Sequence, residues 1–354
     1  MEKIAFPDNR FEQFMVDSVR DSNKTLVYVD GDDPRTAAAA AEFTKLNPSR
    51  LIFLGTAGKI EDNLSRAGLK SDKIEIIEPG KSERSDHYCT FLKEIFAGRG
   101  KDIGDRDIAG LVSKTNYYAA LMLKEGSADG CVSGSISSTG DMMKPLIQVI
   151  GTGDTKKSIS GAAMQIIPDS SCGPGGKILF SDIAVIPDPD ERQMIYIVLE
   201  SYRTARILFE DEPKIAMLSY STWGSAKSDK IDQINRVIEK IKKIDPAIKI
   251  DGELQFDAAI AEDVARNKGG SSEVAGHANV LIFPNLDAGN ICIKAIHRLA
   301  KTKYYGTIIQ GSPIPFNDLS RGCAPVEILS MSMITLMQIK EKESVKNNSS
   351  IDML

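Results

Sequence analysis

The chain has 354 residues, which favours two domains over a single compact core. Its formal net charge of −5 excludes broad nucleic-acid binding, which needs a basic surface, but it allows a small anionic substrate in a locally cationic cleft. No signal-peptide pattern opens the sequence and no run approaches the ~18 apolar residues of a membrane span. We therefore expect a cytoplasmic protein that binds neither nucleic acid nor membrane.

The first part of the chain alternates strand-like and helix-like patterns. The predicted segments are a strand, turn and helix at 25–46, a strand at 50–55, a helix through Leu64, a strand at 73–79, helices at 83–97 and 105–125, and a strand with a polar turn at 129–140. Such alternation is typical of a parallel α/β sheet.

The pattern changes after residue 150. Two extended segments, GAAMQIIPD (161–169) and GKILFSDIAVIPD (176–188), flank the turn sequence SSCGPGG and predict an antiparallel hairpin. The segments predicted beyond it are helices at 191–208, 228–244 and 289–300, strands at 214–222, 279–285 and 306–311, and a helix from about Pro325. The polar tail from residue 340 is expected to fray.

Several polar motifs have ordinary structural explanations. GTGDTKKS (151–158) has a lysine where a phosphate loop needs its second glycine, so a plain turn is favoured. Asp30, Asp32 and Asp33 offer metal ligands, but a turn and helix N-terminus explains them better. The scattered histidines give no support to a catalytic triad.

Two motifs suggest anion binding. VSGSISSTGDMMKP (132–145) combines hydroxyls, two glycines and Lys144, which fits either an anion site or a capped serine-rich loop. NDLSRGC (317–323) precedes the predicted last helix. Glu327 in that helix is explained by the helix dipole, whereas Ser320 and Arg321 are not obvious caps, and an arginine fork suits phosphate or carboxylate.

Four longer stretches resemble the phosphate acetyltransferase (phosphotransacetylase) family. They are MLSYSTWGSAK (217–227), DGELQFDAAI (251–260), ANVLIFPNLDAGNI (278–291) and NDLSRGC, in the family's order. The resemblance implies two three-layer α/β domains of the isocitrate and isopropylmalate dehydrogenase type, mostly parallel with an antiparallel hairpin. Domain I would comprise 1–152 and 307–354, and domain II 153–306. The active site would lie in the cleft between them, in a homodimer.

The same resemblance implies the reaction and its residues. Acetyl-CoA and phosphate would be interconverted with acetyl phosphate and CoA by direct attack in a ternary complex. CoA is then a substrate, and neither a metal nor a tightly bound cofactor is required. Ser320 and Arg321 would hold the reacting groups, and Glu327 stands where the family has an aspartate base. The positions implied in binding phosphate, acyl group or CoA are Ser133, Gly134, Ser138, Thr139, Lys144, Asn290 and Gly322.

Departures from the family pattern leave alternatives open. Lys144 replaces a family arginine, and another family arginine falls near Phe96 or Arg99 without a clear equivalent. A butyryl-type acyltransferase or a catalytically silent paralogue therefore stays possible. A metal-dependent hydroxyacid dehydrogenase on the related fold would need a convergent aspartate cluster and a nicotinamide site, and the sequence offers neither.

Overall fold

The computed structural model describes residues 4–152, 158–169, 174–268 and 272–347. The chain forms two compact units, Met1–Asp154 with Ser312–Met353 and Thr155–Gly311. The boundary expected between residues 306 and 307 falls inside a strand, β10 (Lys303–Gln310), which pairs with β5 along its length. The chain therefore leaves the second unit only after this strand. Most of GTGDTKKS and residues 170–173 of the hairpin turn lie outside the described residues.

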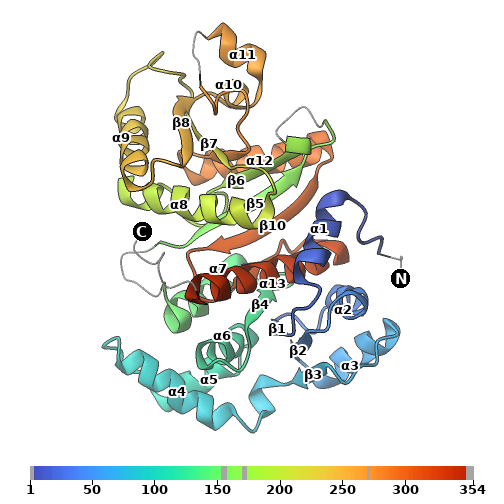
Figure 1. Cartoon of the computed structure of the whole chain (residues 1–354). Coiled ribbons are helices and arrows are strands. Elements are labelled where there is room, and N and C mark those ends of the chain that lie inside the picture. Colours follow the sequence, from blue (N-terminus) through green and yellow to red (C-terminus); the bar gives the residue numbers. More distant parts are fainter. Residues whose placement is uncertain (1–3, 153–157, 170–173, 269–271, 348–354) are drawn as a thin grey trace. The chain divides into compact units, whose positions relative to one another are not determined.

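The first unit contains a five-stranded parallel sheet in the order β11-β4-β1-β2-β3 (Figure 1). The strands are β1 (Thr25–Tyr28), β2 (Arg50–Leu54), β3 (Ile74–Ile77), β4 (Gly130–Ser133) and β11 (Phe316–Asp318). The helices are α1 (Arg10–Val19), α2 (Pro34–Leu46), α3 (Ala57–Arg66), α4 (Ser85–Ala97), α5 (Asp105–Val112), α6 (Thr115–Glu125), α7 (Thr139–Pro145) and α13 (Pro325–Asn347), with short turns η1 (Pro79–Lys81) and η2 (Leu146–Ile150).

The strand order reverses at β1, and this reversal locates a site. The chain runs outward from β1 to β3 through α2 and α3, then returns through α4–α6 to β4 on the other side of β1. Right-handed crossovers place these two sets of helices on opposite faces. Helix α13 packs against both α1 and α2 (Figure 1). In parallel sheets, ligands bind outside the carboxyl ends of the strands at such a reversal, here between β1 and β4.

The predicted helix over 105–125 is two helices. α5 ends at Val112 with Ser113 as its C-cap, and Lys114 is extended before α6 begins. The reason is burial: α5 buries only Ile108 and Val112, whereas α6 is buried from Asn116 to Leu123, so the two need different orientations.

The second unit has a six-stranded mixed sheet in the order β10-β5-β6-β9-β7-β8. The predicted antiparallel hairpin is confirmed, with Ala163 opposite Phe180. The other strands are β5 (Ser160–Ile166), β6 (Lys177–Ser181), β7 (Lys214–Leu218), β8 (Lys249–Leu254) and β9 (Val280–Ile282), and the helices are α8 (Glu191–Leu208), α9 (Asp229–Ile244), α10 (Phe256–Ile260), α11 (Glu262–Asn267) and α12 (Leu286–Ala300), with the short turn η3 (Pro174–Gly176). An α/β fold with mostly parallel strands is thus confirmed.

The last helix is longer than expected. α13 continues to Asn347, into the segment expected to fray, and is buried from Ile328 to Ile339. Its apolar and small residues, ILSMSMITLMQI, explain this burial because they leave no polar face. None of the described helices combines the length and apolar character that a membrane crossing requires.

Candidate functional site

Three loops leave neighbouring strands of the first unit at the same edge of its sheet. They follow β1, β4 and β11, which are adjacent in the order β11-β4-β1. The loop after β1 carries Asp30, the loop after β4 carries Gly134–Ser138, and β11 ends with Asp318, two residues before Ser320. Most of the candidate residues are therefore brought to one edge.

Asp30 holds the loop after β4. Its Oδ2 accepts the backbone N–H of Gly134 (2.7 Å) and of Ile136 (3.2 Å) and the Ser135 hydroxyl (3.4 Å), and its Oδ1 accepts the Ser137 hydroxyl (2.7 Å). The carboxylate is buried. Asp30 is thus an internal anion that uses the donors this loop was expected to offer to a ligand.

The remaining hydroxyls of this loop are also occupied. Ser133 is buried and donates to Asn116 Oδ1 (2.9 Å). Ser138 is the N-cap of α7, where it accepts the Asp141 N–H (3.2 Å) and donates to that carboxylate (2.6 Å). The capped-loop interpretation therefore describes Ser133 and Ser138. Of the residues expected to form an anion site here, Lys144 remains exposed and able to contact a ligand.

Asp318 connects β11 to the start of α7. Its Oδ2 accepts the Thr139 hydroxyl (2.7 Å), while its buried Oδ1 has no hydrogen-bond partner within the described part of the chain. The residue is 2% exposed, and this burial, reinforced by the nearby Asp30, raises the carboxyl pKa to about 6 despite the Thr139 bond. Gly134, at φ +99°, packs against it: an added Cβ would lie 2.2 Å from Oδ1. Glycine is therefore required there.

We expect Asp318→Asn to change how stability depends on pH. Because the folded pKa is about 6 and the ordinary value 3.8, the folded protein holds more protons between these values than the unfolded chain. Wild-type stability then falls as pH rises through this window and stays lower above it, by about 3 kcal/mol at ~1.4 kcal/mol per pKa unit. Asparagine does not titrate. The free energy of unfolding measured with urea should therefore increase for Asp318→Asn relative to wild type as pH rises through this window. Parallel pH profiles would contradict this.

The NDLSRGC turn presents its polar groups outward. Ser320, Arg321 and Gly322 are exposed, and the Arg321 guanidinium has no hydrogen bond or ion pair with any described residue. The Ser320 carbonyl accepts the Cys323 N–H (2.9 Å). Downstream, Glu327 is half-buried and its Oε1 accepts the Ala324 N–H (2.9 Å) at the start of α13, as the expected helix-start acid does.

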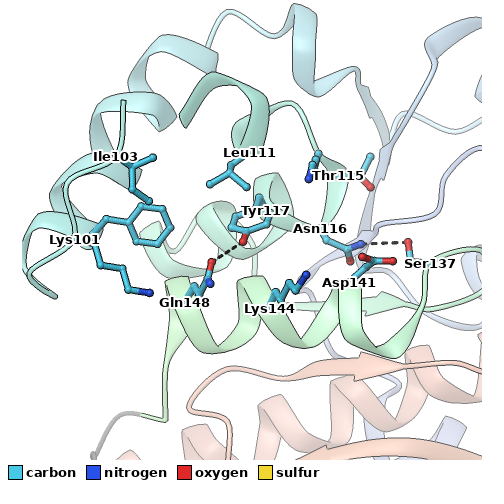
Figure 2. Close-up of a pocket in the computed structure, with 12 residues that line it drawn as sticks. Lys101, Ile103, Leu111, Thr115, Asn116, Tyr117, Ser137, Asp141, Lys144 and Gln148 are labelled. Atoms are coloured by element: carbon cyan, nitrogen blue, oxygen red, sulfur yellow. Dashed lines mark hydrogen bonds between the residues drawn. The ribbon is translucent and has the colours of Figure 1, made fainter. Parts of the chain in front are cut away.

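Lys144 lines a cavity of about 630 Å³ in the first unit. Figure 2 shows Asp141, Lys144 and Gln148 projecting from α7 and η2 toward α6. The other lining residues are Phe96, Lys101, Ile103, Leu111, Lys114, Thr115, Asn116, Tyr117 and Ser137. Hydrogen bonds from Tyr117 to Gln148 (2.6 Å) and from Asn116 to Ser137 (3.2 Å) fix its walls. The lining combines apolar side chains with uncharged polar groups and three exposed lysines, Lys101, Lys114 and Lys144, and this mixture suits an organic anion.

Arg99, near which a family arginine was expected, has a structural contact. It donates to the Ile147 carbonyl (2.7 Å) at the end of the α7–η2 helix. Asn290 lies in the second unit, on α12, where its amide donates to the Ile183 carbonyl (3.0 Å). Asp33 caps α2, as expected for a helix N-terminus. No cluster of three His, Cys, Asp or Glu that could hold a metal occurs among the residues described.

Three residues organise this edge: Asp30, Arg35 and Asp318. Sequence reasoning explained Asp30 as part of a turn and helix N-terminus, and it assigned no role to Arg35 or Asp318. Asp30 lies two residues after β1 and Asp318 is the last residue of β11, so both stand where a parallel strand ends, and Asp318 occurs inside NDLSRGC, which was noticed for other residues. A signal was therefore present, because a carboxylate directly after a parallel strand points to the edge where sites form.

Comparisons with known proteins agree over nearly the whole chain. The family model "Phosphate acetyl/butaryl transferase" matches residues 10–336. A phosphate acetyltransferase of Clostridium acetobutylicum is 40% identical over 319 residues, 90% of this chain and 95% of its own. A phosphotransacetylase structure from Streptococcus pyogenes superposes with a TM-score of 0.85 at 32% identity, covering 94% of this chain and 98% of its own. A Salmonella typhimurium structure described as a putative 4-hydroxythreonine-4-phosphate dehydrogenase, at 12% identity, a TM-score of 0.51 and coverage of 90% and 100%, shares the fold alone.

Proposed function

Since the chain belongs to the phosphate acetyl/butyryl transferase family, we propose that it transfers an acetyl group reversibly between CoA and inorganic phosphate. In this proposal CoA and acetyl-CoA, phosphate and acetyl phosphate are its substrates. The observation that carries the proposal is the NDLSRGC turn, which holds an exposed hydroxyl and an exposed guanidinium side by side with no protein partner for the guanidinium among the described residues. Such a fork binds a phosphoryl group through two parallel hydrogen bonds.

The proposed reaction needs one proton transfer and one displacement. Glu327 takes the proton of the CoA thiol, and the thiolate sulfur forms a bond to the carbonyl carbon of acetyl phosphate. The bond from that carbon to the phosphate oxygen then breaks, and phosphate leaves. Ser320 donates to the developing oxyanion, while Arg321 and Lys144 stabilise the charge on phosphate.

Thioester formation from acetyl phosphate and CoA tests this function directly. Activity with purified protein supports it, and complete inactivity of correctly folded protein would favour a silent paralogue. The same assay with butyryl phosphate distinguishes the butyryl-type alternative, because a hydrophobic pocket separates substrates by ~10–200-fold for each methylene.

We expect Lys144→Ala to weaken phosphate binding more than it affects the fold. Lys144 is exposed at the cavity and has no ion pair with a described residue, so its loss removes a charge-assisted contact of about 1.5–3 kcal/mol. The KM for phosphate should rise ~10–100-fold. Lys144→Arg should match or improve on wild type, and Lys45→Ala, which removes an exposed lysine paired with Glu42 on α2, is the control. An unchanged KM for phosphate would exclude Lys144 from the site.

We also propose a cytoplasmic homodimer. The face of α12 supports self-association, because Ile291 (67% exposed), Ala295 and Leu299 (84% exposed) follow one another at four-residue spacing. A second copy about a two-fold axis would cover the same face on both chains. Light scattering should give the mass of two chains for wild type and a lower mass for Leu299→Asp. A monomeric wild-type protein would contradict the proposal.

A further inference from the structure

Arg35 lies at the start of α2 and is held there by Asp33. The Asp33 carboxylate caps the helix by accepting the Arg35 N–H (2.9 Å). It also accepts the guanidinium in a fork, with Nε–Oδ1 at 3.0 Å and Nη2–Oδ2 at 2.7 Å. The Arg35 side chain is 30% exposed, so this fork fixes the plane of the guanidinium at the surface of the site.

The other donors of the guanidinium bind main-chain carbonyls of two loops. Nη1 donates to the carbonyls of Arg321 (3.0 Å) and Cys323 (2.9 Å), and Nη2 donates to the Ser135 carbonyl (2.7 Å). One side chain thus joins the loop after β1 to the loop after β4 and to the NDLSRGC turn. The two turn carbonyls flank Gly322, so the contact fixes the direction of the chain on both sides of that residue.

The turn has little other support. Within it, the Cys323 N–H donates to the Ser320 carbonyl (2.9 Å), and the Gly322 N–H makes a long bond (3.4 Å) to the Ser320 hydroxyl. The exposed side chain of Arg321 contributes no hydrogen bond to any described residue. The orientation of Ser320 and Arg321 therefore depends on how their backbone is held, and Arg35 supplies two of the bonds that hold it.

We propose that Arg35 is a positioning residue that orients Ser320 and Arg321 by holding the backbone of their turn. The role requires arginine, because its fixed fork of five N–H donors reaches the carboxylate and three carbonyls together, whereas lysine has three donors on one nitrogen. The inference rests on the proposed function for its effect on catalysis, since Arg35 acts through residues assigned there. Its effect on the turn itself is independent of any substrate.

The turn can be probed without the reaction, because trypsin cleaves after arginine. In wild type the Arg321–Gly322 bond lies in a held turn and should resist limited proteolysis. In Arg35→Lys it should be cut at least ~10-fold faster, with other cleavage rates unchanged. Arg50→Lys is the matched control, since Arg50 forms an exposed ion pair with Glu75 (3.3 Å) away from the turn. Equal cleavage of all three proteins at this bond would overturn the proposal.

The catalytic arm is a double-mutant cycle with Arg321→Lys. Alone, Arg35→Lys should lower kcat ~10-fold with a smaller change in KM, because misplaced groups lose transition-state contacts first. In the Arg321→Lys background it should lower kcat less than ~3-fold. Equal losses in both backgrounds would show that Arg35 acts independently of Arg321 and would overturn the proposal. An inactive wild type with the expected proteolysis would instead refute only the proposed function.

A second variant covers the case in which Arg35→Lys does not fold. Asp33→Asn releases the fork and should show both the faster cleavage after Arg321 and the lower kcat, each in weaker form. Absence of both effects would overturn the proposal that Arg35 positions the turn.

Discussion

Replacing Arg321 with alanine is expected to lower turnover by ~10²-fold or more while leaving the protein folded. The guanidinium is exposed and lacks a protein partner in the described part of the chain, so its removal costs the fold little. Charge builds on phosphate as the acyl–phosphate bond breaks, and a fork aimed there is worth more in the transition state than in the ground state. The loss should therefore appear in kcat and not only in KM.

Arg321→Lys separates charge from geometry. It keeps the positive charge but loses the bidentate fork, and we expect turnover to fall at least ~10-fold, about 1.4 kcal/mol of transition-state stabilisation. Thermal unfolding and light scattering of both variants should match wild type. Near-normal turnover of Arg321→Ala in the acetyl phosphate assay would remove Arg321 from the site, and activity lost in proportion to folded protein would show a structural role instead.

Elements with strong periodic patterns were predictable from sequence. The helix predicted at 191–208 is α8, and the strands predicted at 50–55 and 73–79 are β2 and β3, each within two residues of its ends. Several elements received no prediction, among them α1, α7, α10, α11, β8 and β11. β8 contains Gly252 and three charged residues, and β11 has three residues after a proline, so neither shows the alternation of a strand. Both are strands because neighbouring strands pair with them, which a local pattern does not reveal.

The candidate site was predictable in its motifs but not in its contacts. NDLSRGC was singled out because Ser320 and Arg321 had no capping role, and both are indeed exposed. The loop after β4 was expected to bind an external anion, yet Asp30, more than a hundred residues earlier in the chain, accepts its donors. Sequence spacing cannot place an acidic residue of one strand against the loop of another. Which donors stay free for a ligand is decided by the order of strands in the sheet.

Glu327→Gln is the second substitution for which we expect a large effect, a fall in kcat of ~10²–10⁴-fold if the carboxylate is the base for the thiol. The substitution is informative because Glu327 also has a structural contact: its Oε1 accepts the Ala324 N–H (2.9 Å) at the start of α13. The amide oxygen of glutamine can accept the same bond, as in a capping box, so thermal stability should change little.

Two companions complete this test of the base. Glu327→Asp restores the family residue and a carboxylate one methylene shorter, so it should keep much more activity than the glutamine variant. Glu327→Ala removes base and helix contact together and should lose both activity and about 0.5–2 kcal/mol of stability, the range of a lost cap. A Glu327→Gln enzyme with near-normal kcat would leave Glu327 with its helix-start role alone and would require a different acceptor for the thiol proton.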